Sequence, residues 1–188
     1  MKSVLIPLAD GVEEMEAIIV IDTLRRANWN VVSAGLLPGN VTCSRRVRLS
    51  PDVAWANITP ALFDVLVLPG GREGAKALSK EKQVLETIRN FVQNKKLIAA
   101  ICAGPLVLQA AGILERQKIT CHPSVADKLR HGTQLNRRVV VDGRLITAQG
   151  PGTAFEFALT IIREVDGSEK AHKIARAMLV ENFDSGGI

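Results

Sequence analysis

Cys102 is the residue in this sequence best placed to act as a nucleophile. It follows the apolar run 97–101 and precedes Ala103-Gly104-Pro105, where a helix is expected to begin. Pro105 suits a first helical turn, because a residue there needs no N–H to bond within the helix. Small residues between a buried strand and a helix make room for the tight turn of a nucleophile elbow. We therefore expect Cys102 to project from such a turn.

The expected position of Cys102 at a helix N-terminus also bears on its reactivity. Unpaired backbone N–H groups and the helix dipole can lower the pKa of a cysteine from about 8.5 into a range of roughly 3.5–7.5. The resulting thiolate is both a nucleophile and a target for oxidation. The alternative is a small buried hydrophobic residue without chemistry, which is what most free cysteines are.

A glycine pair lies where it can assist such a thiolate. Gly70 and Gly71 follow the apolar run 65–68, and loops that follow parallel strands meet at one edge of a sheet. The N–H groups of Gly71 and Ala103 are therefore candidate oxyanion donors, and an ordinary tight turn is the alternative. The stretch 70–76 lacks the Gly-Lys-Ser/Thr ending of a phosphate loop, so nucleotide binding is not expected there.

Three carboxylates open the first expected helix, those of Glu13, Glu14 and Glu16. Acidic residues in a first turn commonly complement the helix dipole, which accounts for two of the three. A glutamate that instead faces the Cys102 turn would lose solvent, and its pKa would rise. It would then stay protonated and donate a hydrogen bond to the thiolate.

His122 is a candidate for moving protons at the same site. It follows the strand-like segment 118–121 and precedes Pro123, so it can reach the edge of the sheet that carries Cys102. Histidine titrates near neutral pH. A lone histidine is more often structural or exposed to solvent, and that alternative stays open.

The elements needed to hold these residues alternate between strands and helices. Apolar runs without two-residue alternation predict parallel strands, covered on both faces, at 4–8, 31–34, 65–68 and 97–101. Helical patterns occur at 13–26, 79–93, 105–113, 153–165 and 168–180, with Ser79 and Ser168 as expected N-caps. The apolar faces of the first two helices are expected to include Ile18, Ile21, Val84, Leu85, Ile88 and Val92. Asp142-Gly143 predicts a hairpin between 138–141 and 144–147. The expected fold class is α/β, a three-layer sandwich with a short β-hairpin.

Length and composition favour a globular protein. The chain has 188 residues, of which 47% are hydrophobic and 23% charged, as expected for one domain over residues 1–188. No signal peptide or transmembrane stretch is visible. Three widely spaced cysteines predict neither disulfides nor zinc, and they favour a reducing, cytoplasmic setting. The net charge of +5 is scattered and only 4% of residues are aromatic, so nucleic acid is not expected as the main partner.

With these residues assembled, the chain resembles the ThiJ/PfpI superfamily, and within it the Parkinson-disease protein deglycase branch, the DJ-one subfamily. The motifs that carry the resemblance span nearly the whole chain, at residues 12–16, 43–45, 67–71, 99–105, 122–123 and 150–158. The resemblance implies a flavodoxin-like sheet, a homodimer, and a site that needs neither cofactor nor metal.

The same resemblance assigns roles to particular residues. The catalytic set that it implies is Cys102, Glu16 as the protonated carboxylate beside it, and His122. The oxyanion- and substrate-binding set that it implies is Gly70, Gly71, Ala103, Arg26 and Arg45. Arg26 is expected to reach the site from the partner subunit.

The activities implied by the resemblance are a cofactor-independent glyoxalase reaction on small dicarbonyls and repair of early glycation adducts on proteins. The alternative is an oxidative-stress sensor or redox-regulated chaperone in which the same cysteine is oxidised. A protease is not expected, because the peptidase branch carries a histidine after the nucleophile, where this chain has Ala103. Cys121 is either a resolving thiol for oxidised Cys102 or a passive strand residue.

Overall fold

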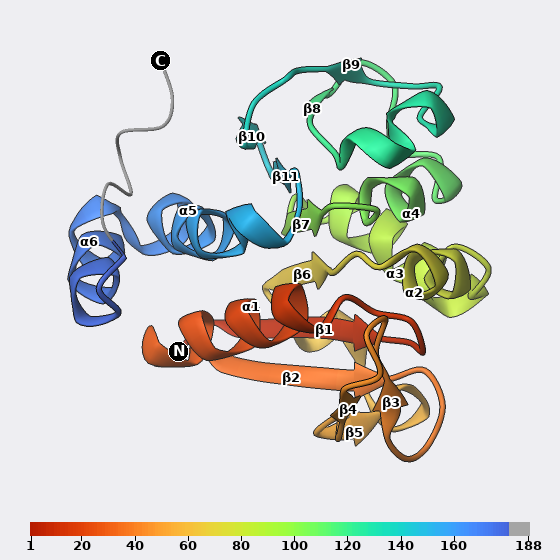
Figure 1. The fold of residues 1–188 in the computed structure, drawn as a ribbon, viewed down its shortest axis with the longest axis horizontal. Coiled ribbons are helices and arrows are strands. Elements are labelled where there is room, and N and C mark those ends of the chain that lie inside the picture. The colour runs from red at the N-terminus through yellow and green to blue at the C-terminus, as the bar shows by residue number, and fades with distance from the viewer. Residues whose placement is uncertain (181–188) are drawn as a thin grey trace.

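The computed structural model describes residues 1–180, which form a seven-stranded sheet covered by helices on both faces (Figure 1). The strand order is β10-β11-β7-β6-β1-β2-β5. Every neighbouring pair is parallel except β10 and β11, which form an antiparallel hairpin. The strands are β1 (Ser3–Leu8), β2 (Asn30–Gly35), β5 (Val53–Ala54), β6 (Val65–Leu68), β7 (Leu97–Ile101), β10 (Val139–Asp142) and β11 (Leu145–Ala148). The α/β sandwich and its hairpin are therefore confirmed.

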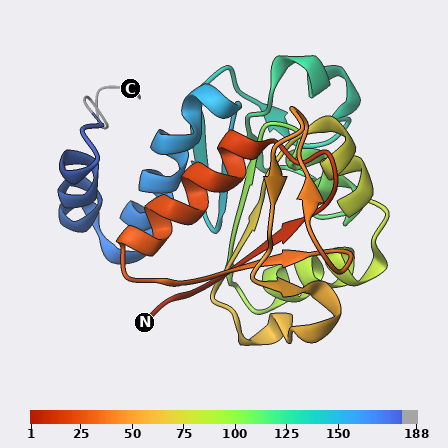
Figure 2. The same cartoon turned by 60° about the horizontal axis from the view of Figure 1, so that its bottom comes forward.

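The helices divide between the two faces of the sheet. They are α1 (Glu14–Arg26), α2 (Arg72–Leu78), α3 (Lys82–Gln93), α4 (Pro105–Ala110), α5 (Ala154–Asp166) and α6 (Ser168–Ala177). Helices α1 and α5 lie side by side (Figure 2), and α6 packs on α5, whereas α2, α3 and α4 pack together on the other face. Two short pairs lie outside the main sheet, β3 (Val41–Thr42) with β4 (Arg48–Leu49) and β8 (Lys118–Ile119) with β9 (Thr133–Gln134). Within residues 1–180, no helix has the length and apolar character needed to cross a membrane.

Strand β1 shows why the strand sequences lack alternation. Val4, Ile6 and Leu8 pack into the core beneath α1 and α5, while Leu5 packs into the core beneath α2–α4. A strand covered on both faces needs apolar side chains at successive positions. The predicted strands at 4–8, 31–34, 65–68 and 97–101 are all present.

The predicted helix 79–93 is wrong in its first part. Residues 72–78 form a separate helix, α2, and Ser79 ends it, with its hydroxyl donating to the Ala75 carbonyl at 2.7 Å. Glu81, not Ser79, caps α3 by accepting the Gln83 N–H. Likewise the residue before α6 is Gly167 at φ +92°, so Ser168 is the first helical residue rather than the cap.

The hairpin is shifted by one residue from its predicted position. Asp142 pairs with Leu145, so Gly143 and Arg144 form the two-residue turn, with Gly143 at φ +61°. A positive φ at the first turn position suits glycine. The side chain of Asp142 accepts the backbone N–H of Lys118 at 2.8 Å, which holds Asp142 in the strand.

Two residues assigned to apolar helix faces are exposed instead. Ile18 on α1 and Val92 on α3 keep 45% and 47% of their surface, while Val20, Leu24 and Phe91 fill the core. Periodicity alone is compatible with more than one apolar face on a helix. The elements that pack against the helix decide which of these faces is buried. The prediction of one domain over 1–188 stays a prediction, and its last residues, 181–188, lie outside those described.

Candidate active site

Cys102 lies at a tight turn between β7 and α4. Its φ is +62°, in the left-handed region that costs a residue with a Cβ on the order of 1 kcal/mol. Its N–H donates to the Ala148 carbonyl on β11 at 2.9 Å, and the Gly104 N–H donates to the Ile101 carbonyl at 2.8 Å. These bonds hold the strained turn, so Cys102 occupies the strand-to-helix position that the sequence predicts.

Gly70 must be glycine because it lies against both Cys102 and Glu16. A Cβ at Gly70 would stand 2.6 Å from the Cys102 Cβ and 2.7 Å from Glu16 Oε2. The Gly70 N–H donates to Glu16 Oε2 at 2.7 Å. Gly70 therefore admits the Glu16 carboxyl to the space beside Cys102 and fixes one of its oxygens there.

Of the three carboxylates at the start of α1, only Glu16 faces the cysteine. Glu13 caps the helix, accepting the Glu16 N–H at 2.8 Å. Glu14 accepts the Ser44 hydroxyl and the Arg45 N–H, each at 2.8 Å. Glu16 has no exposed surface. One carboxylate thus turns inward, which the sequence left open, and the other two bind backbone and loop donors.

The protonation of Glu16 is set mainly by its burial. Burial raises the pKa of Glu16 to about 7, although interactions with Cys102 and with the Gly70 N–H act to lower it. Oε1 is buried without a hydrogen-bond partner among residues 1–180. Such an oxygen is best satisfied when the carboxyl holds a proton that it can share with a neighbour. The neighbour here is the Cys102 sulfur.

The pKa of Cys102 differs from the expectation of a lowered value. Burial raises the pKa of this thiol, and the negative charge of ionised Glu16 raises it further. The N–H groups of Gly71 and Ala103 lower it but do not outweigh those effects. The dipole of α4, which spans only six residues, is a weak opposing force. Two negative charges in this buried space are unfavourable, so the pair holds at least one proton at neutral pH.

Both predicted oxyanion donors act on the cysteine. The backbone N–H groups of Gly71 and Ala103 each lower the pKa of the Cys102 thiol. Gly71 has φ +87°, and a Cβ there would stand 2.2 Å from the Gly11 carbonyl oxygen and 2.6 Å from the Glu13 nitrogen. Gly71 is therefore restricted to glycine by both its conformation and its neighbours.

His122 is attached to the cysteine turn through its main chain. Its N–H donates to the Cys102 carbonyl oxygen at 3.1 Å. Its Nδ1 lies 2.8 Å from the Ser124 hydroxyl and accepts the Ser124 N–H at 3.2 Å, which caps the 3-10 helix Pro123–Lys128. These bonds assign the ring proton to Nε2. Nδ1 thus has a structural role, because it binds Ser124, and Nε2 is the ring nitrogen that remains for proton transfer.

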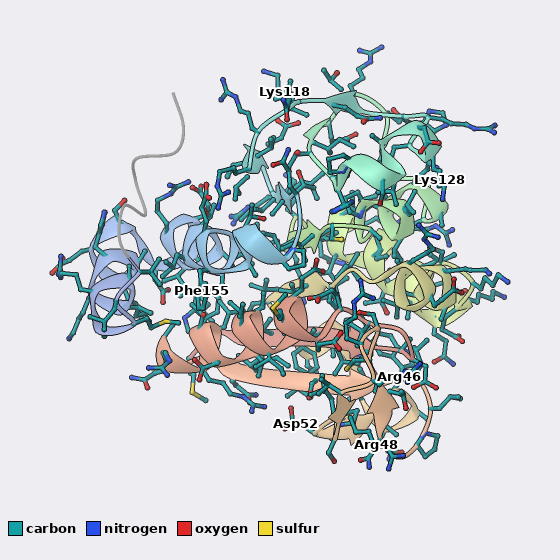
Figure 3. The ribbon with its side chains drawn as sticks, in the orientation of Figure 1. Arg46, Arg48, Asp52, Lys118, Lys128 and Phe155 are labelled. Atoms are coloured by element: carbon teal, nitrogen blue, oxygen red, sulfur yellow. The ribbon has the colours of Figure 1, made fainter. Side chains whose placement is uncertain are left out.

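The two arginines lie differently relative to the site. Arg26 is in the last turn of α1, ten residues and about 15 Å along the helix from Glu16, and it pairs with Asp22 at 2.7 Å. One chain therefore does not bring Arg26 to Cys102. Arg45 lies on the turn between β3 and β4, tied by its N–H to Glu14. Its neighbours Arg46 and Arg48 are exposed on the same hairpin (Figure 3).

The other two cysteines are core residues. Cys43 and Cys121 are 4% and 6% exposed, whereas Cys102 is more accessible. Burial raises the pKa of Cys43 to about 11 and raises that of Cys121 as well. Cys121 packs into the core on the α2–α4 face, and Cys102 packs against the opposite core. Within residues 1–180, no group of three His, Cys, Asp or Glu side chains is arranged to hold a metal ion.

Two residues that shape the site were not identified from the sequence. Gly11, at φ +83°, places its carbonyl oxygen where a side chain at Gly71 would lie. Gly150 packs on the His122 ring, where its Cβ would stand 3.2 Å from Cδ2. The dipeptide Asp10-Gly11 signals a turn, but only the fold shows which loop that turn touches.

The sheet order and the cysteine turn define an α/β protein with a nucleophile elbow. The model of the DJ-1/PfpI family matches residues 2–164, and the chain belongs to this family. Protein dj-1beta of Drosophila melanogaster is 44% identical over 182 residues, which is 95% of this chain and 97% of that protein. Its crystal structure superposes with a TM-score of 0.91 and covers 95% of this chain and 98% of that one.

Two further relatives have informative names. A Caenorhabditis elegans protein, glutathione-independent glyoxalase DJR-1.2, is 39% identical over 177 residues, covering 93% of this chain and 94% of that protein. Toxoplasma gondii DJ-1, solved in an oxidized form, is 35% identical with a TM-score of 0.92, covering 96% of this chain and 100% of that one. The family and the flavodoxin-like fold predicted from the sequence are confirmed.

Proposed function

We propose that this protein is a cofactor-independent glyoxalase and deglycase with Cys102 as its nucleophile. The observation that carries the proposal is the Cys102–Glu16 pair, in which a buried carboxyl with a pKa of about 7 lies beside a thiol whose pKa is lowered by the N–H groups of Gly71 and Ala103. The name of the nematode relative, a glutathione-independent glyoxalase, supports the reaction class.

The first step is addition of Cys102 to an aldehyde. A dicarbonyl such as methylglyoxal binds with its aldehyde carbon against the sulfur. The thiol proton passes to the Glu16 carboxylate as the C–S bond forms, which avoids two negative charges in the buried site. The aldehyde oxygen becomes an oxyanion that accepts the N–H groups of Gly71 and Ala103. Return of a proton to this oxygen gives a neutral hemithioacetal.

The second step moves hydrogen between adjacent carbons. The former aldehyde carbon loses its hydrogen as a proton, giving an enediol, and the neighbouring carbon gains one, giving a thioester of lactate. Glu16 and the Nε2 side of His122 are the groups proposed to carry these protons. Water then hydrolyses the thioester, releasing lactate and the thiol. One carbon is oxidised and its neighbour reduced, so the reaction needs no external oxidant or reductant.

Early glycation adducts fit the same chemistry. Methylglyoxal bound to a cysteine, lysine or arginine side chain forms a hemithioacetal or hemiaminal, whose C–S or C–N bond breaks to release the free aldehyde. Cys102 then captures the aldehyde and converts it to lactate. Glycated proteins and small dicarbonyls are therefore the proposed substrates.

The test is formation of lactate from methylglyoxal without glutathione. We expect turnover by the parent and its loss in Cys102→Ala, while Cys121→Ala, a second buried cysteine, retains it. A Cys102→Ala protein as active as the parent would end the proposal.

Oxidative sensing, or redox-regulated chaperone action, is the second candidate. The oxidized form of the Toxoplasma relative supports it. Peroxide would transfer one oxygen to the Cys102 thiolate to give a sulfenate, and a second peroxide would give a sulfinate, with water or hydroxide as the other product. Protonated Glu16 would donate to a sulfinate oxygen. Intact mass after mild peroxide tests this candidate: two added oxygens on Cys102, with negligible dicarbonyl turnover, would favour sensing over catalysis.

We also propose that the chain forms a homodimer through α1 and the β3–β4 hairpin. Met15 and Ile18 on α1 keep 53% and 45% of their surface, and Val47 on the hairpin keeps 43%. The hairpin contacts the start of α1 through the bond from the Arg45 N–H to Glu14, and exposed apolar side chains on neighbouring elements are typical of an interface. A partner packed there is the proposed source of Arg26 at the cysteine pocket.

A reducing compartment suits a reaction that depends on a free thiol, and the cytoplasm is the proposed location. We do not expect nucleic acid as the main partner. Absence of salt-sensitive duplex binding at low ionic strength is the expected result, and tight duplex binding would contradict it.

A further inference from the structure

A concave site lies at the opposite end of β7 from Cys102. It has a volume of about 210 Å³ and lies between the end of α3, the start of β7 and the β10–β11 turn. Ile98, one of its lining residues, precedes Cys102 by four residues, about 13 Å along an extended strand. The pocket is therefore separate from the proposed active site.

Four apolar side chains line the pocket, those of Val92, Ile98, Ile113 and Leu145. Ile98 and Leu145 are buried, and we take them as its apolar floor. Val92 is the α3 residue expected in the core but found 47% exposed. Its exposed surface lines this hollow, so an apolar group placed here would cover a side chain that the fold itself leaves in water.

Two basic side chains at the pocket are not engaged elsewhere. Lys95 follows α3 with φ +54°, and Arg144 lies in the hairpin turn, where its carbonyl accepts the Ile98 N–H at 3.0 Å. The backbone of both residues is thus fixed. Their charged groups form no ion pair or hydrogen bond with residues 1–180, and both residues line the pocket.

The other two ionisable residues that line the pocket, Lys96 and Asp142, form hydrogen bonds with other parts of the chain. Lys96 Nζ donates to the carbonyls of Ala61 and Phe63 at 2.6 and 2.8 Å, and it lies over the Phe91 ring. The Asp142 carboxylate accepts the Lys118 N–H. Lys96 and Asp142 keep their opposite charges, so the net charge of the lining comes from Lys95 and Arg144, whose side chains have no partner among residues 1–180.

We propose that this pocket binds a small amphiphilic carboxylate, with its hydrocarbon part on the apolar floor and its carboxylate between Lys95 and Arg144. The volume equals roughly seven water molecules' share of the liquid. That space suits a ligand with a chain of about six carbons and is below the 300–1,000 Å³ typical of drug-sized ligands. Arginine and lysine are the side chains that bind carboxylates by charge-assisted hydrogen bonds.

Hexanoate is the probe, and its binding is measured by calorimetry and by amide shifts in heteronuclear NMR spectra. We expect saturable binding, with shifts confined to residues around 92–98, 113–117 and 142–145. Acetate, which lacks the hydrocarbon part, and hexanol, which lacks the charge, should each bind more weakly. Protein alkylated at Cys102 should bind hexanoate as the parent does, because the two sites are separate.

Two substitutions and a matched control decide the role of the charges. Lys95→Gln and Arg144→Gln should each weaken hexanoate binding by about two- to fivefold, and added salt should weaken it in the parent. Lys80→Gln removes an exposed lysine that does not line the pocket and should leave binding unchanged. No saturable binding at millimolar hexanoate, or equal binding by the Lys95→Gln/Arg144→Gln double variant, would overturn the proposal.

Discussion

The backbone N–H of His122 donates to the carbonyl oxygen of Cys102 at 3.1 Å. This bond attaches the segment after β8 directly to the cysteine turn, although twenty residues separate the two along the chain. With Nδ1 held by Ser124, the imidazole is fixed at both its main chain and one ring nitrogen. A fixed ring is what a proton carrier needs, because proton transfer depends on hydrogen-bond geometry.

Replacing His122 should therefore separate proton transfer from nucleophilic attack. For His122→Gln we expect kcat for lactate formation to fall about a hundredfold, while the rate of Cys102 alkylation stays near that of the parent. Ser124→Ala, which loosens the ring without removing it, should have a smaller effect. An unchanged kcat in His122→Gln would show that the imidazole is purely structural.

Glu16 should make the stability of the protein depend on pH. Its folded pKa of about 7 lies above the ordinary value of 4.5, so the folded state binds the proton more tightly than the unfolded state. The stabilisation is complete below pH 4.5 and is lost as pH rises to about 7, on the order of 3 kcal/mol in all. Glu16→Gln should lack this contribution. Denaturant unfolding of both proteins between pH 4.5 and 8 measures the difference, and parallel curves would contradict the assignment.

Gly71 and Gly112 form a matched pair for testing the cysteine loop. Both have positive φ, +87° and +73°, but a Cβ at Gly112 meets nothing within 4 Å, whereas one at Gly71 meets the Gly11 carbonyl oxygen at 2.2 Å. Gly112→Ala should cost only about 1–2 kcal/mol of unfolding free energy and keep activity. Gly71→Ala should lose more stability and nearly all lactate formation. Equal effects of the two substitutions would show that the Gly71 loop has room to adjust.

The proposed dimer can be tested with one charge on α1. Ile18→Glu places a carboxylate in the proposed interface, and we expect the molecular mass in solution to fall to that of a monomer. Leu62→Glu is the control, since Leu62 is more exposed, at 77%, and belongs to the 3-10 helix Pro60–Leu62, which packs against α3. A parent that is already monomeric, or an Ile18→Glu protein that stays dimeric, would contradict the interface.

The parts of the fold predicted from the sequence are those fixed by local pattern. Apolar runs gave the four main parallel strands, and the small residues around Cys102 indicated its turn. Local pattern did not fix the helix boundaries. Ser79 and Glu81 are both suitable N-caps by residue type, and Ser79 is excluded only because it ends α2, which begins at Arg72. The hairpin was misplaced by one residue because the contact between Asp142 and Lys118 is made across the fold.

For the site, the sequence predicted which groups lie around the cysteine turn but not the direction of its pKa shift. The sequence left open whether one α1 carboxylate turns inward, and its identity as Glu16 needed the family resemblance or the contact with Gly70. The expected lowering of the Cys102 pKa was wrong, because burial and the Glu16 charge depend on packing that no local motif contains. The proposed role of Arg26 requires the proposed homodimer, because Arg26 lies about 15 Å along α1 from Glu16 in one chain.

The central claim is that Cys102 and Glu16 act as one unit that shares a proton. It is tested most directly by the rate of Cys102 alkylation against pH in the parent and in Glu16→Gln. The pair loses its first proton near pH 7, mainly from Glu16, and the reactive thiolate is the share of the singly protonated pair in which the remaining proton has moved from the sulfur to Glu16. The parent alkylation rate should therefore rise through a midpoint near pH 7, and Glu16→Gln, which leaves a buried thiol with no carboxylate to take its proton, should move that midpoint to higher pH. A parent midpoint near 8.5, the value of an ordinary cysteine, that Glu16→Gln leaves in place would contradict the account.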